Sequence, residues 1–324
     1  MNINFIHDEH DVLQRGITHE QMEVICERAF ASMTIRSVTE LEFGMFNNTF
    51  KVETADERFI LRISPHPDTP LSRYEQDLMR REYSIQPFLA PLSNLFPKCI
   101  YSDFTRTLIN RDYVVITFLE GENWHELKDS FSKEENDRIW FEAGETAKLL
   151  SSITSDNFGS PSPAPQYSSW YDYVCTYMNS MRNDLAAKGF VYPEVNNFLE
   201  SAERFKPALD LIDKGRLVHG DMWPKNILIQ KHGGNYRISG IIDSERAYWG
   251  DEASEWIHAF INVSPSFWDG YGKLYCPDGK EERLQFYYGM HNVMATIESR
   301  LRDNNHPEWS LNNLARLNEK LCRK

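Results

Sequence analysis

Residues 217–229 read LVHGDMWPKNILI and carry the strongest signal in the chain. Two apolar runs flank a polar loop that contains Asp221 and, five residues later, Asn226. A further apolar run, residues 238–242, is followed by a second carboxylate, Asp243. Short apolar runs bounded by polar turn residues are typical of buried strands. The pattern therefore predicts two carboxylates and one carboxamide close to strand ends.

These three side chains form a set of hard oxygen ligands. Mg²⁺ in proteins takes one or two carboxylates together with substrate phosphates. The catalytic loop of protein kinases has the same order of groups: an Asp positions the hydroxyl nucleophile, an Asn binds Mg²⁺, and a later Asp binds Mg²⁺ again. The spacing thus indicates phosphoryl transfer, with Asp221 as the candidate catalytic residue and Asn226 and Asp243 as candidate Mg²⁺ ligands.

The chain resembles the aminoglycoside phosphotransferase and choline kinase-like family in several short motifs. They are His219-Gly220-Asp221, Asn226, Ile242-Asp243 and Gly250-Asp251. The resemblance covers about residues 41–260. It implies that His219 is structural and that Asp251 holds the backbone of the catalytic loop.

The resemblance implies an α+β, two-lobed, protein kinase-like fold. Residues 1–118 would form an N-terminal nucleotide-binding lobe with a five-stranded antiparallel sheet and a helix. Residues 119–122 would be the hinge, and residues 123–324 a mostly helical lobe for catalysis and substrate binding. The local pattern agrees at the start of the chain, because Thr18 and Gln21 predict a capping box before a helix.

The resemblance further implies that ATP or GTP is the phosphoryl donor. The residues that it assigns to the nucleotide are Gly44, Asn47, Arg62, Glu82, Phe118 and Glu120. Arg62 stands where kinases carry their phosphate-binding Lys, and Glu82 would pair with its guanidinium group. The apolar pattern also singles out Glu82, which lies on the inner side of a helix expected over residues 72–86, before Pro87. A carboxylate turned toward a core needs a cationic or hydrogen-bonding partner.

The acceptor is expected to be a small molecule with a free hydroxyl group. By resemblance, the first candidate is an aminoglycoside or a related antibiotic, which would give the protein a role in antibiotic resistance. Choline, homoserine and sugar-type metabolites are the alternative. Candidate substrate residues are Trp223, Glu245 and Trp170, although Trp170 also belongs to a helical stripe that favours the core. Of Glu245, Glu252 and Glu255, at least two are expected to be solvated.

Composition and charge indicate which classes of partner the chain can bind. With 35 Lys and Arg against 48 Asp and Glu, the formal net charge is −13. Such a chain lacks the basic footprint of a nucleic-acid-binding protein, and the charge suits a cationic acceptor. Residues 1–11 lack the basic residues followed by an apolar run that mark a secretory signal. No apolar run approaches the ~18 residues of a membrane span. The five cysteines are scattered, which does not favour a disulfide framework. We therefore expect a cytoplasmic protein with no nucleic-acid or membrane partner.

Three other interpretations are open. His219 and Asp221 with His258 or His291 match the ligand types of a 2-His-1-carboxylate iron centre, although the chain after Asp243 has a helical pattern. The loop at residue 44 has few glycines, which favours a non-catalytic binding module with the kinase fold. A protein Ser/Thr kinase would share the fold, but no long activation segment follows Asp243.

Overall fold

The computed structural model describes residues 2–8, 10–11, 13–42, 44–92, 94–302 and 304–323. Phe43, beside the predicted nucleotide loop, lies outside the described residues. The chain divides into two compact units. The first comprises Met1–Thr69 with Leu89–Gly121, and the second comprises Pro70–Phe88 with Glu122–Lys324. The predicted lobe boundaries and the hinge at residues 119–122 stay a prediction.

The first unit contains a six-stranded sheet in the order β1-β2-β3-β4-β6-β5. The strands are β1 (Asn2–Asn4), β2 (Ile35–Glu40), β3 (Asn48–Thr54), β4 (Arg58–Ile63), β5 (Cys99–Asp103) and β6 (Tyr113–Thr117). All neighbours are antiparallel except β1 and β2, which are parallel. The expected five-stranded antiparallel sheet is therefore wrong by one strand. The three residues of β1, Asn-Ile-Asn, do alternate, and Ile3 packs against the core, but a run this short is too weak a signal to predict a strand.

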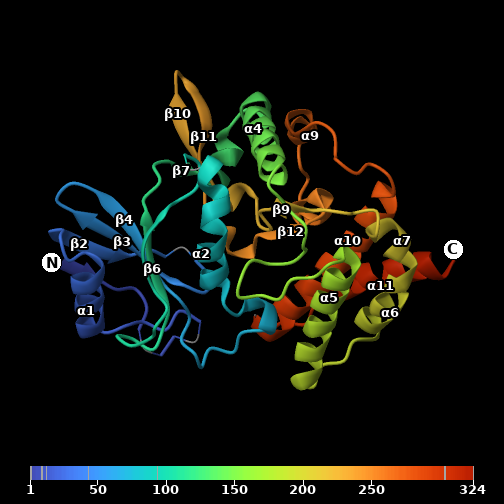
Figure 1. Cartoon of the computed structure of the whole chain (residues 1–324), viewed down its shortest axis with the longest axis horizontal. Coiled ribbons are helices and arrows are strands. Elements are labelled where there is room, and N and C mark those ends of the chain that lie inside the picture. The colour runs from blue at the N-terminus through green and yellow to red at the C-terminus, as the bar shows by residue number, and fades with distance from the viewer. Residues whose placement is uncertain are drawn as a thin grey trace. The chain divides into compact units, whose positions relative to one another are not determined.

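The sheet of the first unit packs on helix α1 (His19–Ala29), which lies beside β2 and β3 in Figure 1. The predicted capping box is confirmed, because the Thr18 side chain accepts from the Gln21 backbone and the Gln21 side chain accepts from the Thr18 backbone. Alternate residues of β3 are buried, and Phe50 packs in one cluster with Met22 and Ile25 of α1. The inward-facing residues of the strand and the apolar face of the helix thus pack together in one core.

Helix α2 (Leu78–Leu89) differs from the helix expected over residues 72–86. It starts later because Asp77 has a φ of 58°, a left-handed conformation that interrupts an α-helix. It continues past Pro87, which lies inside its last turn. A proline removes the hydrogen bond to the carbonyl four residues earlier, but its fixed φ is itself helical, and the helix continues for only two residues beyond it.

The second unit is mostly helical, with two small three-stranded sheets. Its other helices are α3 (Trp124–Leu127), α4 (Lys133–Ser151), α5 (Trp170–Ala187), α6 (Pro193–Ser201), α7 (Lys206–Leu209), α8 (Ile257–Phe260), α9 (Pro265–Tyr271), α10 (Lys280–Ile297) and α11 (Glu308–Cys322). The sheets run β11-β10-β7 and β12-β9-β8. Their strands are β7 (Glu122–Asn123), β8 (Thr154–Ser155), β9 (Gly215–Val218), β10 (Ile227–His232), β11 (Asn235–Ile241) and β12 (Tyr248–Gly250). No helix within the described ranges is long and apolar enough to cross a bilayer.

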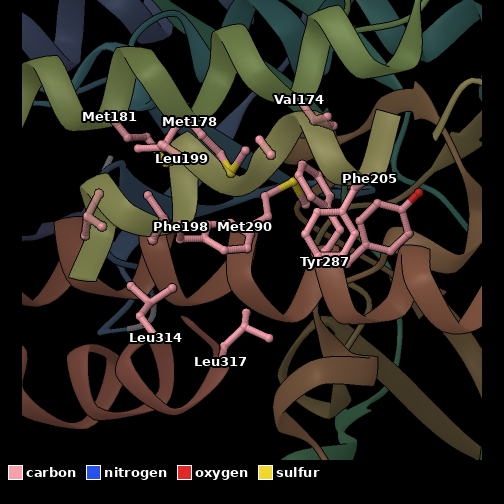
Figure 2. Close-up of a cluster of buried hydrophobic side chains, with 14 of the residues drawn as sticks. Val174, Met178, Met181, Phe198, Leu199, Phe205, Tyr287, Met290, Leu314 and Leu317 are labelled. Carbon is pink, nitrogen blue, oxygen red and sulfur yellow. The ribbon is translucent and has the colours of Figure 1, made fainter. Parts of the chain in front are cut away.

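The core of the second unit lies between helices α5, α6, α10 and α11, as Figure 2 shows. Val174, Met178 and Met181 of α5 face Phe198 of α6 and Met290 of α10. In the helical stripe predicted on α5, Trp170, Val174 and Met181 are thus confirmed as core, whereas Tyr173 and Tyr177 are partly buried and line a cavity. The strands β9 and β11 pack on helix α4, and the predicted catalytic residues stand at the ends of β9, β10 and β11.

Asp251, directly after β12, forms a fully buried ion pair with Arg283 of α10, with 2.6 Å between Oδ2 and Nε. The Tyr287 hydroxyl donates to the same oxygen at 2.7 Å, and the backbone N–H of Ala253 donates to Oδ1 at 3.0 Å. The expectation that Asp251 binds the catalytic loop is therefore wrong. Its carboxylate anchors the turn after β12 to α10.

We predict that Asp251→Asn lowers the free energy of unfolding by about 3–5 kcal/mol, because it leaves the buried Arg283 guanidinium without its counter-charge. Urea denaturation measures the change. Lys128→Gln, in the exposed pair with Asp129, is the control and should cost less than about 1 kcal/mol. A similar loss in both variants would contradict the role assigned to Asp251.

Candidate active site

The loop that joins β9 to β10 is held by close backbone packing at Gly220. This residue has a φ of +79°, and the carbonyl oxygen of Arg246 lies 2.2 Å from the place where a Cβ would be. Any side chain at position 220 would collide with that backbone, so glycine is required here. The turn after β11 can thereby approach the loop that carries Asp221.

Asp221 is held by two side chains at once. The indole Nε1–H of Trp256 donates to Oδ1 at 2.8 Å, and the amide Nδ2 of Asn226 donates to Oδ2 at 2.9 Å. The same amide nitrogen donates to the backbone carbonyl of Asp221 at 2.8 Å. Because Nδ2 makes both bonds, the orientation of the Asn226 amide is determined by its partners. Its oxygen is left for another ligand.

Asp243 stands where the chain leaves β11, and the structure brings it close to Asn226. The backbone N–H of Ile242 donates to the carbonyl of Asn226 at 3.0 Å. Asp243 itself adopts a left-handed conformation, with φ 59° and ψ 53°. This sharp reversal ends the strand and begins the turn Ser244–Arg246. The predicted trio of Asp221, Asn226 and Asp243 is thus gathered by neighbouring segments of one unit.

Glu255 has a role that sequence reasoning missed. Its Oε2 accepts a 2.9 Å hydrogen bond from the backbone N–H of Gly220, and backbone bonds from Met222 and Trp256 also favour its charged form. Burial nevertheless raises its pKa to about 8. Glu255 thus holds the catalytic loop, the role expected of Asp251. Both acids follow β12 within a few residues, so the sequence alone does not show which of them contacts the loop.

The expectation that at least two of three nearby glutamates are solvated is wrong, because Glu245, Glu252 and Glu255 are all less than 9% exposed. Glu252 accepts from the backbone N–H of Tyr275 at 2.5 Å and lies 3.5 Å from Arg216. The short turns after β11 and β12 fold these acids inward, whereas a sequence window shows only their high polarity.

His219 is buried, and its Nδ1 accepts a hydrogen bond from the backbone N–H of Asp221 at 3.3 Å. Burial lowers its pKa to about 4, while the charge of Asp243 opposes the shift. The imidazole is therefore neutral at neutral pH. These contacts support the predicted structural role.

The carboxyl group of Asp221 has an unusual pKa of about 6. Burial is the main cause, and the neighbouring carboxylate of Asp243 raises it further. The Arg246 charge and the hydrogen bonds from Trp256 and Asn226 act in the opposite direction. A carboxylate with a pKa close to neutrality is a better proton acceptor than an ordinary one.

The three predicted substrate residues have different surroundings. Trp223 is half-buried, with its ring centroid 5.5 Å from that of Trp256. Glu245 is buried in the turn after β11. Trp170 is 1% exposed, donates to the Tyr287 hydroxyl at 2.8 Å and stacks on Tyr248.

The predicted nucleotide residues lie in both units. Gly44 has a φ of +123°, which favours glycine, and the Asn47 carbonyl accepts a 3.0 Å bond from the Gln14 side chain. Arg62 on β4 is buried in the first unit, and Glu82 on α2 is buried in the second. Their ion pair stays a prediction.

At the predicted hinge, Arg58 lies over the Phe118 ring at 4.6 Å and pairs with Glu120. These contacts lie within the first unit. They brace the segment that follows β6, while its contact with the nucleotide base stays a prediction.

The model of the phosphotransferase enzyme family matches residues 37–287. The chain belongs to this family, which confirms the predicted resemblance. None of the curated proteins compared with it matches the chain.

Solved structures establish the fold as protein kinase-like, as predicted. A thermostable mutant of aminoglycoside phosphotransferase APH(4)-Ia is similar with a TM-score of 0.66 and 17% identity, over 92% of this chain and 98% of that one. A putative fructosamine-3-kinase from Haemophilus somnus has a TM-score of 0.65 and 13% identity, over 92% and 97%. The GDP complex of aminoglycoside 2'-phosphotransferase-IIIa has a TM-score of 0.64 and 14% identity, over 94% and 99%.

The iron centre considered above has no support. In the part of the chain that the structure describes, no group of three or more His, Cys, Asp and Glu side chains is arranged to hold a metal ion. The pKa values of the half-buried His258 and the buried His291 are instead lowered to about 3 and about 4, chiefly by desolvation.

We predict that Asp221→Asn changes how stability depends on pH. The folded-state pKa of about 6 exceeds the ordinary value of 3.8, so the native state keeps a proton that the unfolded chain has already released. Wild-type stability therefore falls as pH rises from about 4 to about 6, and the variant lacks this loss. Over that interval the difference in unfolding free energy should move in the variant's favour by up to about 3 kcal/mol.

Urea denaturation at pH values between about 4 and 7 measures this difference. Asp129→Asn, on the surface, controls for the removal of one carboxylate. A wild-type-minus-variant difference that stays constant with pH would contradict the desolvation of the Asp221 carboxyl group.

We predict that Glu255→Ala reduces turnover by roughly 10–100-fold, because the Gly220 N–H loses its acceptor and the loop is no longer held. Glu255→Gln keeps an acceptor oxygen and should retain most activity. Nucleoside diphosphate release measures kcat and KM separately. Equal loss in both variants would contradict a positioning role and indicate that the charge itself is needed.

Proposed function

We propose that this protein transfers the γ-phosphoryl group of ATP or GTP to a hydroxyl group of a small molecule. Membership of the phosphotransferase enzyme family supports the reaction class. The observation that carries the proposal is the carboxylate of Asp221, fixed by Trp256 and Asn226 and given a pKa of about 6. This is the geometry and basicity that a residue aligning a hydroxyl nucleophile requires.

Asp221 would act mainly by positioning. Each carboxylate oxygen accepts one hydrogen bond from the protein and has capacity for another, which the acceptor hydroxyl would donate. Phosphoryl transfer passes through a loose transition state, so the proton leaves the hydroxyl late and alignment matters more than strong basicity. At neutral pH most Asp221 side chains are ionised and ready to accept that proton.

The donor set fits Mg²⁺. The Asn226 amide uses its nitrogen toward Asp221, which leaves the hard oxygen for a cation, and the backbone bond from Ile242 keeps Asp243 near it. One carboxylate and one amide oxygen, with phosphate oxygens added, form a typical magnesium set. When bound, the ion would neutralise charge on the phosphates. Asn226 would then have two tasks, to ligate the metal and to hold Asp221.

The remaining nucleotide residues are proposed on the resemblance and their location. Gly44 and Asn47 belong to a loop tied to residue 14, and Arg62 provides a buried guanidinium for phosphate oxygens. Glu82 is proposed to orient that guanidinium. Phe118 and Glu120 are proposed to present the backbone that reads the base.

The class of acceptor is proposed from the resemblance and from the similar solved structures. Similar solved structures include aminoglycoside phosphotransferases and a putative fructosamine-3-kinase, so an antibiotic and a sugar-amine metabolite are both represented among them. Transfer to an aminoglycoside or related antibiotic stays the sequence-based prediction. Residues Trp223, Glu245 and Trp170 stay its predicted contacts.

We predict that Asp221→Ala lowers the phosphotransfer rate by roughly 10²–10⁴-fold while nucleotide affinity changes only a few-fold, because the residue contacts the acceptor rather than the donor. Coupled detection of ADP or GDP release measures the rate. The melting temperature with ATP or GTP, each with and without Mg²⁺, reports donor binding by mass action.

A Mg²⁺-dependent rise in melting temperature that persists in Asp221→Ala, together with the lost rate, is the expected pair of results. Full activity in Asp221→Ala would refute the proposed mechanism. No melting shift with either nucleotide would favour the non-catalytic binding module.

A further inference from the structure

A cavity of about 50 Å³ lies beside the catalytic loop of the second unit. Gly220 and Trp256 form part of its wall, and the Trp256 indole donates directly to Asp221. Much of the remaining wall is aromatic, formed by Tyr74, Trp170, Tyr173, Tyr177 and Tyr248. Its volume is about a third of the ~150 Å³ that encloses benzene in a protein core. A small functional group or the edge of one ring fits, whereas a whole oligosaccharide does not.

The charge of this wall is positive. Arg81 and Arg246 line the cavity, and none of its lining residues among those described is Asp or Glu. The nearby carboxylate of Glu298 is already used. It accepts from the Tyr74 hydroxyl at 2.7 Å and from Arg246 at 3.2 Å, and it pairs with Arg302 at 3.5 Å.

The two guanidinium groups act on the tyrosine hydroxyls of the wall. Burial raises the pKa of Tyr177, and the charges of Arg246 and Arg81 both oppose that rise. Arg81 likewise opposes the rise for Tyr173. The formal charge of the whole chain is −13, but in salt a charge acts over about 8 Å, so nearby groups determine the local sign. Arg246 is already balanced by Glu298 and interacts with the Asp221 charge, which leaves Arg81 as the cation for a ligand among the described lining residues.

Two buried polar atoms of lining residues have no partner in the described part of the chain. The Arg81 guanidinium donates through Nη1 to the Tyr74 carbonyl at 3.0 Å, but its Nε–H is buried without an acceptor. His291 is 5% exposed, its Nε2 bonds the Ser254 carbonyl at 2.8 Å, and its Nδ1 is buried without a partner. Since a carbonyl only accepts, Nε2 carries the proton and Nδ1 is an acceptor. A buried polar group left unpaired is costly. The Arg81 Nε–H therefore indicates a missing acceptor, whereas the His291 Nδ1 indicates a missing donor, such as a hydroxyl or N–H group.

We propose that this cavity, as the acceptor-selecting part of the phosphotransferase proposed above, takes the carboxylate end of a small hydroxyl compound, whose ring or other flat apolar body enters only by its edge. The carboxylate would accept from Arg81, and the aromatic wall would contact the edge of the apolar body. A polycationic aminoglycoside would instead bring like charges against Arg81. The inference rests on the proposed function, and it replaces the cationic acceptor that overall charge favours.

The test compares probes that share one ring and one hydroxymethyl group and differ only in charge. They are 3-(hydroxymethyl)benzoate and 3-(hydroxymethyl)benzylamine, with kanamycin as a polycation. Calorimetry on the full chain without nucleotide should show the benzoate binding at least about tenfold more tightly than the benzylamine. Equal or tighter binding of either cation, or no benzoate binding at about 10 mM, would overturn the proposal.

The variant Arg81→Gln should reduce that preference by about tenfold, because a charged hydrogen bond to the carboxylate is lost. Arg81→Lys should still bind the benzoate more tightly than the benzylamine. Arg182→Gln on α5 removes the same charge away from the cavity, so it should leave the ratio of the two affinities unchanged. An unchanged preference in Arg81→Gln would overturn the proposal. Should that variant fail to fold, the wild-type preference decides instead, since added salt must weaken it.

The two proposals fail in different ways. If no probe is phosphorylated in an Asp221-dependent manner while the benzoate preference stands, the proposed function fails and the anion-binding cavity remains. If transfer occurs but prefers cationic acceptors, the reaction stands and the cavity assignment fails.

Discussion

The backbone N–H of Gly220 donates to the buried carboxyl group of Glu255 at 2.9 Å, and the carbonyl of Arg246 lies where residue 220 would otherwise carry a Cβ. These contacts hold the loop after β9 against the turns that follow β11 and β12. Asp221 can then be fixed by Asn226 from its own loop and by Trp256 from the chain beyond β12. The positions of the side chains in the candidate site therefore depend on the packing of the backbone at Gly220.

That packing has an electrostatic cost. Asp221 and Glu255 are both desolvated, and their pKa values rise to about 6 and about 8. Such groups are tolerated only because the surrounding unit is held by other means, among them the helical core of Figure 2 and the ion pair of Asp251 with Arg283. Perturbed carboxylates are commonest at functional sites, where reactivity is maintained at the expense of stability.

The proposed reaction and the proposed selection of the acceptor depend on different parts of the second unit. The loop with Asp221 and the strand end with Asp243 carry the pattern shared with the phosphotransferase enzyme family. Most of the cavity wall comes from α2, α5, α10 and the residues around β12, and Gly220 of the catalytic loop completes it. A fold does not determine a substrate, and the local charge of Arg81 can oppose that of the whole chain.

The sequence by itself determined the order of Asp221, Asn226 and Asp243, the strands on either side of them and the capping box at Thr18, because spacing and polarity are local properties. It could not distinguish Glu255 from Asp251, since both are acids shortly after one strand, and only the tertiary structure turned one to Gly220 and the other to α10. Likewise β1 joins the sheet through backbone groups that every residue has. Burial, pKa and the charge of a cavity depend on neighbours distant in sequence, and so only folding decided them.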